Sequence, residues 1–239
     1  MDSDFRVALA WVILHVPLLY LVAAVLGGLW DDNVHFYRLL KLTKWICLSV
    51  LMEAPVLVCP SNHIAVVAAR VLNQGFLCAL FFLVHYIREK REPPMSLRHR
   101  VCYALLVENC AAYSLTWNYV QTAMLAGALL AEDFGAGPQA VWFLHLVLLV
   151  ICALFIASVE LIYPCTYQWT VAAHLPIQIW VYYLYQYSAI DGKTVCALTA
   201  FDALLLLCKI FAPEKGTEYS TISQEEDQGE DMDLKSSVV

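Results

Sequence analysis

The chain has 239 residues, of which 61% are hydrophobic and only 15% are charged. A soluble domain carries about 25% charged residues, and the apolar residues here lie in long blocks, so the composition excludes an ordinary soluble domain and predicts a protein embedded in a lipid bilayer. The formal net charge of −7 resides largely in the last residues, which leaves the apolar part near neutral and predicts no nucleic-acid partner.

Seven apolar segments follow one another along the chain. They are Phe5–Trp30, Trp45–Cys59, His63–Ile87, Val101–Leu130, Gln139–Tyr163, Tyr167–Tyr187 and Thr194–Phe211. A helix that crosses a bilayer needs about 20 apolar residues, and the second segment is shorter than that. The predicted fold is therefore an all-α polytopic transmembrane helix bundle over residues 1–212, with seven helices, or six if the second segment does not span. Pro176 predicts a kink in the sixth helix, because proline lacks the N–H group of one helical hydrogen bond.

Basic residues cluster in two linkers between the apolar segments, at 38–44 and 88–100. Short loops rich in Lys and Arg stay on the cytoplasmic side of a membrane, so both linkers are predicted to be cytosolic. The second and third segments then form a hairpin whose tip faces outward, the N-terminus lies outside, and the C-terminus lies in the cytosol. The predicted location is the plasma membrane or an endosomal membrane.

One pair of ionisable residues falls inside the predicted hairpin, where a charge is costly unless it finds a partner. Glu53 precedes the hairpin tip and Arg70 follows it by a similar distance, which predicts that the two side chains meet at one depth. Two interpretations remain open. The pair is either a buried staple that holds the hairpin together or part of a polar surface that lines a path for lipid headgroups or ions.

A second layer of polar residues is predicted near the cytosolic side, with Glu108 and Asn109 on the fourth segment, His174 on the sixth and Asp202 on the seventh. Equal depth does not by itself establish contact, but His174 and Asp202 lie on consecutive antiparallel segments, which favours it. The layer is either hydrogen-bonded glue between helices or a relay for protons or substrate. Glu160, at the inner end of the fifth segment, is expected to reach interfacial water.

The sequence carries no signature of enzyme chemistry. It has no Walker loop, dinucleotide-binding glycine pattern, GxSxG or HExxH motif. The nine cysteines form no CxxC or Cys/His metal pattern, and most lie in apolar segments, where they are expected to act as small apolar residues. We therefore expect no enzymatic activity, no cofactor and no metal site.

Residues 213–239 are polar and acidic and are predicted to form a disordered cytosolic tail. Two short patterns in this tail predict protein partners. Tyr219-Ser-Thr-Ile222 fits a sorting signal that clathrin adaptors read: a tyrosine, then two residues of any kind, then a bulky residue. Ser236-Ser-Val-Val239 places a hydroxyl, that of Ser237, two residues before a terminal valine, which is typical of a PDZ-domain ligand.

Part of the chain, about residues 75–164, resembles the XK-related membrane proteins. A helix ends in a basic linker, 88–100, and is followed by Tyr103-Ala-Leu-Leu-Val-Glu-Asn109 and then Trp117-Asn-Tyr119, which is similar to the family's basic loop and its apolar helix bearing Leu-Glu-Asn. Leu51-Met-Glu-Ala-Pro55 resembles a Glu-x-x-Pro element of the family. Ile162-Tyr-Pro164 lacks the histidine of the family pattern, and this chain is shorter than typical members.

Members of that family are phospholipid scramblases or partners of other surface proteins. The resemblance implies that Glu53, Arg70, Glu108 and Asn109 lie along a path for lipid headgroups. Three classes of function are open: a transport-type protein that moves lipid or a small solute, a scaffold or accessory subunit that acts through its tail and through helix contacts in a homo- or hetero-oligomer, and a seven-span receptor. No Asp-Arg-Tyr or Asn-Pro-x-x-Tyr element supports the receptor.

Overall fold

The computed structural model describes residues 42, 44–49, 51–52, 62–89, 97–162, 170–186 and 191–210. Within these ranges all regular structure is helical, which confirms the predicted all-α class for this part of the chain. The helices are α4 (His63–Glu89), α5 (Leu97–Tyr103), the π-helix η1 (Ala104–Glu108), α6 (Asn109–Glu132), α7 (Pro138–Ile162), α8 (His174–Gln186) and α9 (Gly192–Ile210). The first apolar segment, most of the second and the tail lie outside the described residues.

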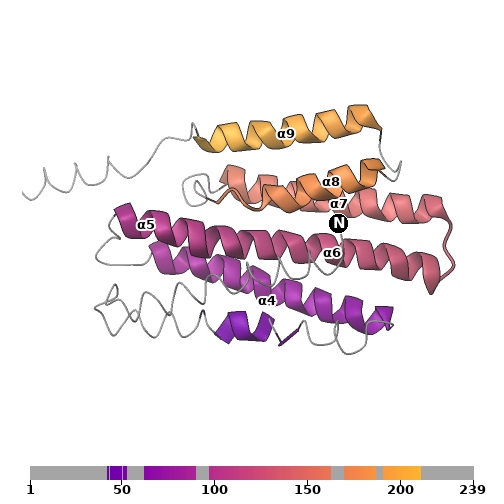
Figure 1. Cartoon of the computed structure of the whole chain (residues 1–239), viewed down its shortest axis with the longest axis horizontal. Helices are drawn as coiled ribbons and strands as arrows, with labels where there is room; N and C mark the ends of the chain where they lie inside the picture. Colours follow the sequence, from indigo (N-terminus) through magenta and orange to yellow (C-terminus); the bar gives the residue numbers. More distant parts are fainter. Residues whose placement is uncertain are drawn as a thin grey trace, which may run out of the picture.

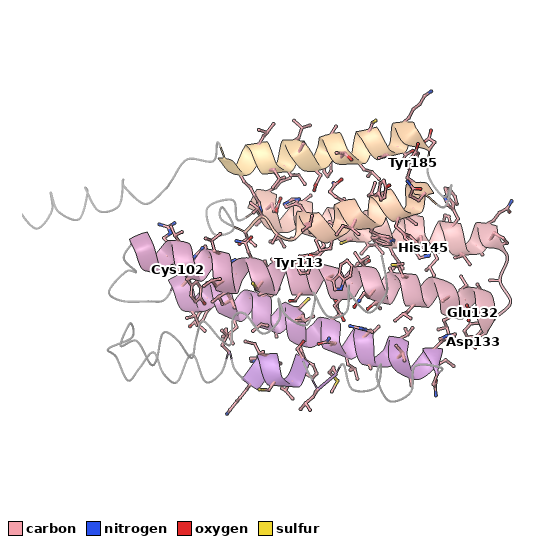
Figure 2. All side chains as sticks on the ribbon, viewed as in Figure 1. Cys102, Tyr113, Glu132, Asp133, His145 and Tyr185 are labelled. Carbon is pink, nitrogen blue, oxygen red and sulfur yellow. The ribbon has the colours of Figure 1, made fainter. Side chains whose placement is uncertain are left out.

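Helix α6 is the central element of the bundle. It packs against α4 on one side and against α7 and α8 on the other, while α9 packs on α8 (Figure 1). Helices α5 and η1 continue directly into α6, so residues 97–132 form one unbroken helical rod. Figure 2 shows Cys102 and the pair Glu132 and Asp133 at opposite ends of the bundle.

The composition of α6 explains its central position. Most of its buried residues are small or polar, and alanine, serine, threonine and glycine allow helices to approach closely. One apolar core lies between α4 and the N-terminal half of the rod, and a second lies where α6 meets α7 and α8. Neighbouring helices therefore cover α6 on most of its circumference.

Helices α4 and α7 are long and apolar enough to cross a membrane, by length and composition. Helix α7 buries few of its residues and exposes a continuous set of large apolar side chains. These are Trp142, Phe143, Val147, Val150, Ile151, Leu154, Phe155, Leu161 and Ile162. A monomeric soluble protein rarely exposes an apolar surface of this extent. The exposed apolar face of α7 therefore agrees with the predicted embedding in a bilayer.

Local sequence explains where α6 ends and α7 begins, and where α9 begins. Gly135 adopts a positive φ of 64°, a conformation that glycine reaches without steric cost, and Pro138 begins α7, where its missing N–H group has no helical partner to lose. Asp191 caps α9 by accepting a hydrogen bond from the Thr194 backbone N–H at 2.9 Å. Hydrogen bonds from the Thr194 side chain and backbone lower the pKa of the exposed Asp191 carboxyl.

Helix α8 is shorter than the predicted sixth segment. The sequence predicts a helix over Tyr167–Tyr187 with a kink at Pro176, whereas the helix begins at His174. Pro176 therefore lies in the first turn, where a residue without an N–H group breaks no helical hydrogen bond. The prediction of a kink is wrong, because the proline lies in the first turn of the helix instead of in its interior.

We expect the close approach of α6 and α7 to make Gly127 intolerant of a side chain. A Cβ atom at Gly127 would clash with the imidazole ring of His145, whose Cε1 would lie 2.9 Å away, whereas a Cβ atom at Gly75 of α4 would meet no atom within 4 Å. Gly127→Ala should lower the free energy of unfolding by about 1–3 kcal/mol through overpacking, measured by denaturation in detergent micelles. Gly75→Ala is the matched control and should be neutral or stabilising. Equal stability of the two variants would contradict the expectation.

Candidate functional site

Four ionisable side chains from three helices meet in the interior of the bundle, and we call them the charged cluster: Glu160 (α7), His174 (α8), Asp202 and Lys209 (α9). His174 Nδ1 lies 2.5 Å from Asp202 Oδ1, and His174 Nε2 lies 2.8 Å from Glu160 Oε1. Lys209 Nζ forms an ion pair with Glu160 Oε1 and donates a hydrogen bond to the Thr170 carbonyl. The cluster thus joins α7, α8 and α9 at one point.

The charges of the cluster are matched to one another. Its four side chains are each no more than 13% exposed, and a buried charge is costly unless it is paired and hydrogen-bonded. Each ring nitrogen of His174 faces a carboxylate oxygen, an arrangement in which both nitrogens donate only when the ring is an imidazolium. With His174 and Lys209 cationic and the two carboxylates anionic, the cluster has no net charge.

The structure brings two of the predicted site residues together and adds two others. His174 and Asp202 are neighbours, as their consecutive antiparallel segments predict. Glu160 was expected to reach interfacial water, and this expectation is wrong, because the side chain is buried against His174 and Lys209. Lys209 was not among the predicted site residues. Its position two helical turns after Asp202, on the same face of α9, was the signal that could have found it.

Polar side chains extend the charged cluster along α8 and α9. Gln178 Nε2 donates to Asp202 Oδ2 at 2.7 Å, and Thr199 Oγ1 donates to Gln178 Oε1 at 3.2 Å. Both oxygens of Asp202 therefore accept hydrogen bonds. A row of polar contacts continues from the cluster toward the N-terminal end of α9.

A second polar group, the amide network, lies between α4 and α6 and consists of Arg70, Asn73, Gln74 and Asn118. Asn118 Oδ1 accepts hydrogen bonds from Arg70 at 3.2 Å and from Asn73 at 3.4 Å, and Asn118 Nδ2 donates to Gln74 Oε1 at 2.7 Å. Ser49 donates to Asn73 Oδ1 at 2.7 Å. Arg70 is thus placed inside the bundle, as predicted, while its predicted partner Glu53 lies outside the described residues.

Glu108 does not join the charged cluster that contains His174 and Asp202. Its carboxylate is fully buried and pairs with Arg88, whose Nη1 lies 2.8 Å from Oε1 and 2.9 Å from Oε2. The predicted layer of equal depth is therefore divided. Depth along a helix is readable from sequence, but the rotation of each helix decides which residues at that depth face one another, and Glu108 faces α4.

Asn109 holds the segment that precedes α8. Its Oδ1 accepts the backbone N–H groups of Val171 at 2.8 Å and Ala172 at 2.9 Å, and its Nδ2 donates to the Ala104 carbonyl in η1 at 2.8 Å. Asn109 is thus placed beside the backbone rather than among the ionised groups of the predicted layer. Because the held segment ends at His174, Asn109 positions the first residue of the charged cluster on α8.

A cavity of about 240 Å³ connects the two polar groups. It is lined by Gln74 of the amide network and by Glu160 and Lys209 of the charged cluster. Most of its remaining lining comes from apolar side chains of α4, α6 and α7. Ile151 and Phe155 line the cavity and are also 51% and 42% exposed on the outer face of α7, so the cavity reaches the surface of the bundle beside α7.

The remaining predicted sites lie outside the part of the chain that the structure describes: Glu53, the sorting motif Tyr219 to Ile222, and the PDZ ligand Ser237 and Val239. In the described part, no group of three or more His, Cys, Asp or Glu residues is placed to hold a metal ion. No protein-family model, no curated protein and no solved structure matches this chain.

Proposed function

We propose that the chain is a multi-pass membrane protein that moves a lipid or a small solute along an internal path formed by the cavity and the two polar groups. In this proposal the bundle has seven spans, or six if residues 45–59 do not cross. The basic linkers and the tail lie in the cytosol and the N-terminus lies outside. The membrane is the plasma membrane or an endosomal membrane.

The observation that carries the proposal is the position of the cavity. Gln74 of the amide network and Glu160 and Lys209 of the charged cluster all line it, so a polar group moving through the bundle would find partners from both polar groups. A path of this kind reduces the cost of taking a headgroup or a polar solute out of water. The partial resemblance to XK-related proteins makes lipid the first cargo to test.

The composition of the charged cluster also favours a functional role. Replacing a buried ion-pair group by apolar side chains is often neutral or stabilising, so stability alone gives little reason to keep four ionisable groups in the bundle. Ionisable residues inside a membrane protein commonly mark pathways for ions, protons or substrates. His174 lies between two carboxylates, and a change in its protonation would change the net charge of the cluster.

We expect Asp202→Asn to reduce transport in liposomes that contain the purified full-length chain. The change removes one of the two anions that face His174 and weakens charged hydrogen bonds worth about 1.5–3 kcal/mol each, which corresponds to roughly a ten- to hundredfold loss of rate if they act in the transport step. The measurement is lipid flip and solute leak in parallel. Asp191→Asn, at the exposed cap of α9, is the matched control and should leave both rates unchanged.

A competing proposal is that the chain is a scaffold or accessory subunit. The tail patterns Tyr219 to Ile222 and Ser237 to Val239 favour it, because they predict a clathrin adaptor and a PDZ-domain protein as partners. In that case deleting residues 236–239 abolishes the cellular function, Asp202→Asn does little, and liposomes containing the unmodified chain show neither lipid flip nor solute leak. The last result would overturn transport as the proposed function.

A further inference from the structure

We infer that the cavity binds an amphipathic alcohol, with its apolar tail in the cavity and its hydroxyl group donating a hydrogen bond to Glu160. This inference rests on the proposed function, because it names the class of molecule that would occupy the proposed path. Three observations carry it: an unpartnered carboxylate oxygen, the charge balance around that oxygen, and the apolar lining with its opening beside α7.

The first observation concerns the two oxygens of Glu160. Oε1 receives both His174 Nε2 and Lys209 Nζ, whereas Oε2 is buried and has no hydrogen-bond partner among the described residues. Glu160 is only 6% exposed and lines the cavity. A buried carboxylate oxygen without a donor is costly. Oε2 itself has almost no accessible surface, so a hydroxyl group in the cavity would supply the donor once the Glu160 carboxylate turns Oε2 toward it.

The second observation selects a neutral donor. With His174 and Lys209 cationic and Glu160 and Asp202 anionic, the charged cluster has no net charge, and Lys209 also lines the cavity. An ammonium headgroup would add an uncompensated positive charge beside Lys209 in a medium of low dielectric constant, which is unfavourable. A carboxylate headgroup would face Glu160 and donate no hydrogen bond when it is ionised. A hydroxyl group adds no charge and supplies the missing donor.

The third observation concerns the tail. An apolar cavity of ~150 Å³ in a soluble protein binds benzene, and the cavity here, at about 240 Å³, admits a chain of several methylene groups. Aliphatic and aromatic side chains such as Leu115, Ile156 and Phe81 line it. Ile151 and Phe155 connect it with the exposed apolar face of α7, so a tail longer than the cavity can continue along that face.

The test uses a photoreactive diazirine derivative of 1-octanol with the full-length chain in lipid nanodiscs, and the labelled residues are mapped by mass spectrometry. We expect saturable labelling of residues that line the cavity. Unlabelled 1-octanol should compete, while octyl methyl ether, which has the same tail and no donor, should compete about tenfold less well, as the loss of one hydrogen bond to a charged group predicts. Octylamine and octanoate should also compete less well than the alcohol.

Two pairs of variants locate the site. Ile151→Trp narrows the opening beside α7 and should reduce labelling severalfold, whereas Leu154→Trp, on the same exposed face but away from the cavity lining, should not. In Glu160→Gln, the amide oxygen takes the place of Oε1 beside His174 and Lys209, and the amide NH₂ takes the place of Oε2. The amide then donates, so the ether should compete nearly as well as the alcohol. Glu132→Gln, at an exposed carboxylate, should keep the preference for the alcohol.

Two results would overturn the inference. One is labelling that spreads over the outer face of α7 and is not competed by 1-octanol. The other is equal competition by the alcohol and the ether in the unmodified chain. Thermal unfolding shows whether Glu160→Gln folds. If it does not fold, two measurements still test the inference: the relative competition by the alcohol and the ether in the unmodified chain, and the extent of labelling in Ile151→Trp. Binding requires no flux, so liposomes without transport would refute the proposed function and leave the alcohol site standing.

Discussion

Arg88→Met should destabilise the bundle by about 3–5 kcal/mol, because removing one partner of a buried ion pair leaves an uncompensated charge. Both oxygens of the fully buried Glu108 carboxylate lie within 2.9 Å of Arg88 Nη1. His85 Nε2, at 3.9 Å from Glu108 Oε2, already lies 3.0 Å from Thr170 Oγ1, so it is not a ready substitute for the guanidinium. The measurement is the free energy of unfolding in detergent micelles.

A double variant separates the charge from the packing of Arg88. Arg88→Met combined with Glu108→Gln leaves no ionised group behind, so most of the lost stability should return. Lys193→Met, at an exposed position in the first turn of α9, is the matched control for the loss of a cation and should change stability little. If the double variant is as unstable as Arg88→Met alone, the stability comes from the packing of the arginine stem and the ion-pair explanation fails.

Asn109→Ala should be the second most damaging substitution, at a cost of roughly 2–4 kcal/mol, because it removes three hydrogen bonds of one buried amide and leaves backbone groups without their partner. The side chain accepts from Val171 and Ala172 and donates to the Ala104 carbonyl. The effect should be local as well as global. Hydrogen exchange should accelerate more at the amides of Val171 and Ala172 than at the amides of α8.

Asn109→Asp is the informative comparison for that prediction. A carboxylate keeps the acceptor for Val171 and Ala172 and loses the donor to Ala104, so slow exchange at the two amides should persist although stability falls. Thr122→Ala, which removes a hydroxyl that donates only to the Asn118 carbonyl of its own helix, is a control for loss of a local hydrogen bond. Unchanged exchange at Val171 and Ala172 in Asn109→Ala would show that other contacts hold this segment.

The Asn109 contacts also link the fold to the candidate site. Thr170, in the held segment, accepts a hydrogen bond from Lys209, and His174, just after it, binds Glu160 and Asp202. A variant that releases this segment is therefore expected to disturb the charged cluster without changing any of its members. Reduced transport in Asn109→Ala with preserved transport in Asn109→Asp would place Asn109 among the positioning residues of the path.

Several helices could be predicted from sequence to within one or two residues at their ends. The predicted His63–Ile87, Gln139–Tyr163 and Thr194–Phe211 correspond to α4, α7 and α9. The length of an apolar run and the charges or turn residues beside it are local properties, which is why these predictions succeed. The N-terminal end of α8 was predicted wrongly, since an apolar and aromatic composition continues through residues that precede the helix.

The candidate site depended more strongly on tertiary structure. The contact of His174 with Asp202 was readable because consecutive antiparallel helices bring residues of equal depth together. The pairing of Glu108 with Arg88, of Glu160 with Lys209, and the hold of Asn109 on the backbone before α8 were not readable. Each depends on how far its helix is rotated about its axis, and no local pattern of residues specifies that rotation.

The sequence by itself determined that the described part of this chain is helical and carries long apolar helices with a few ionisable groups among them. Only the tertiary structure decided which of those groups meet and that a cavity connects them. The physical reason is the difference in range. Helix formation and burial of an apolar run are governed by neighbours along the chain, whereas charge pairing and cavity shape are governed by the packing of side chains from α4, α6, α7, α8 and α9 around one another.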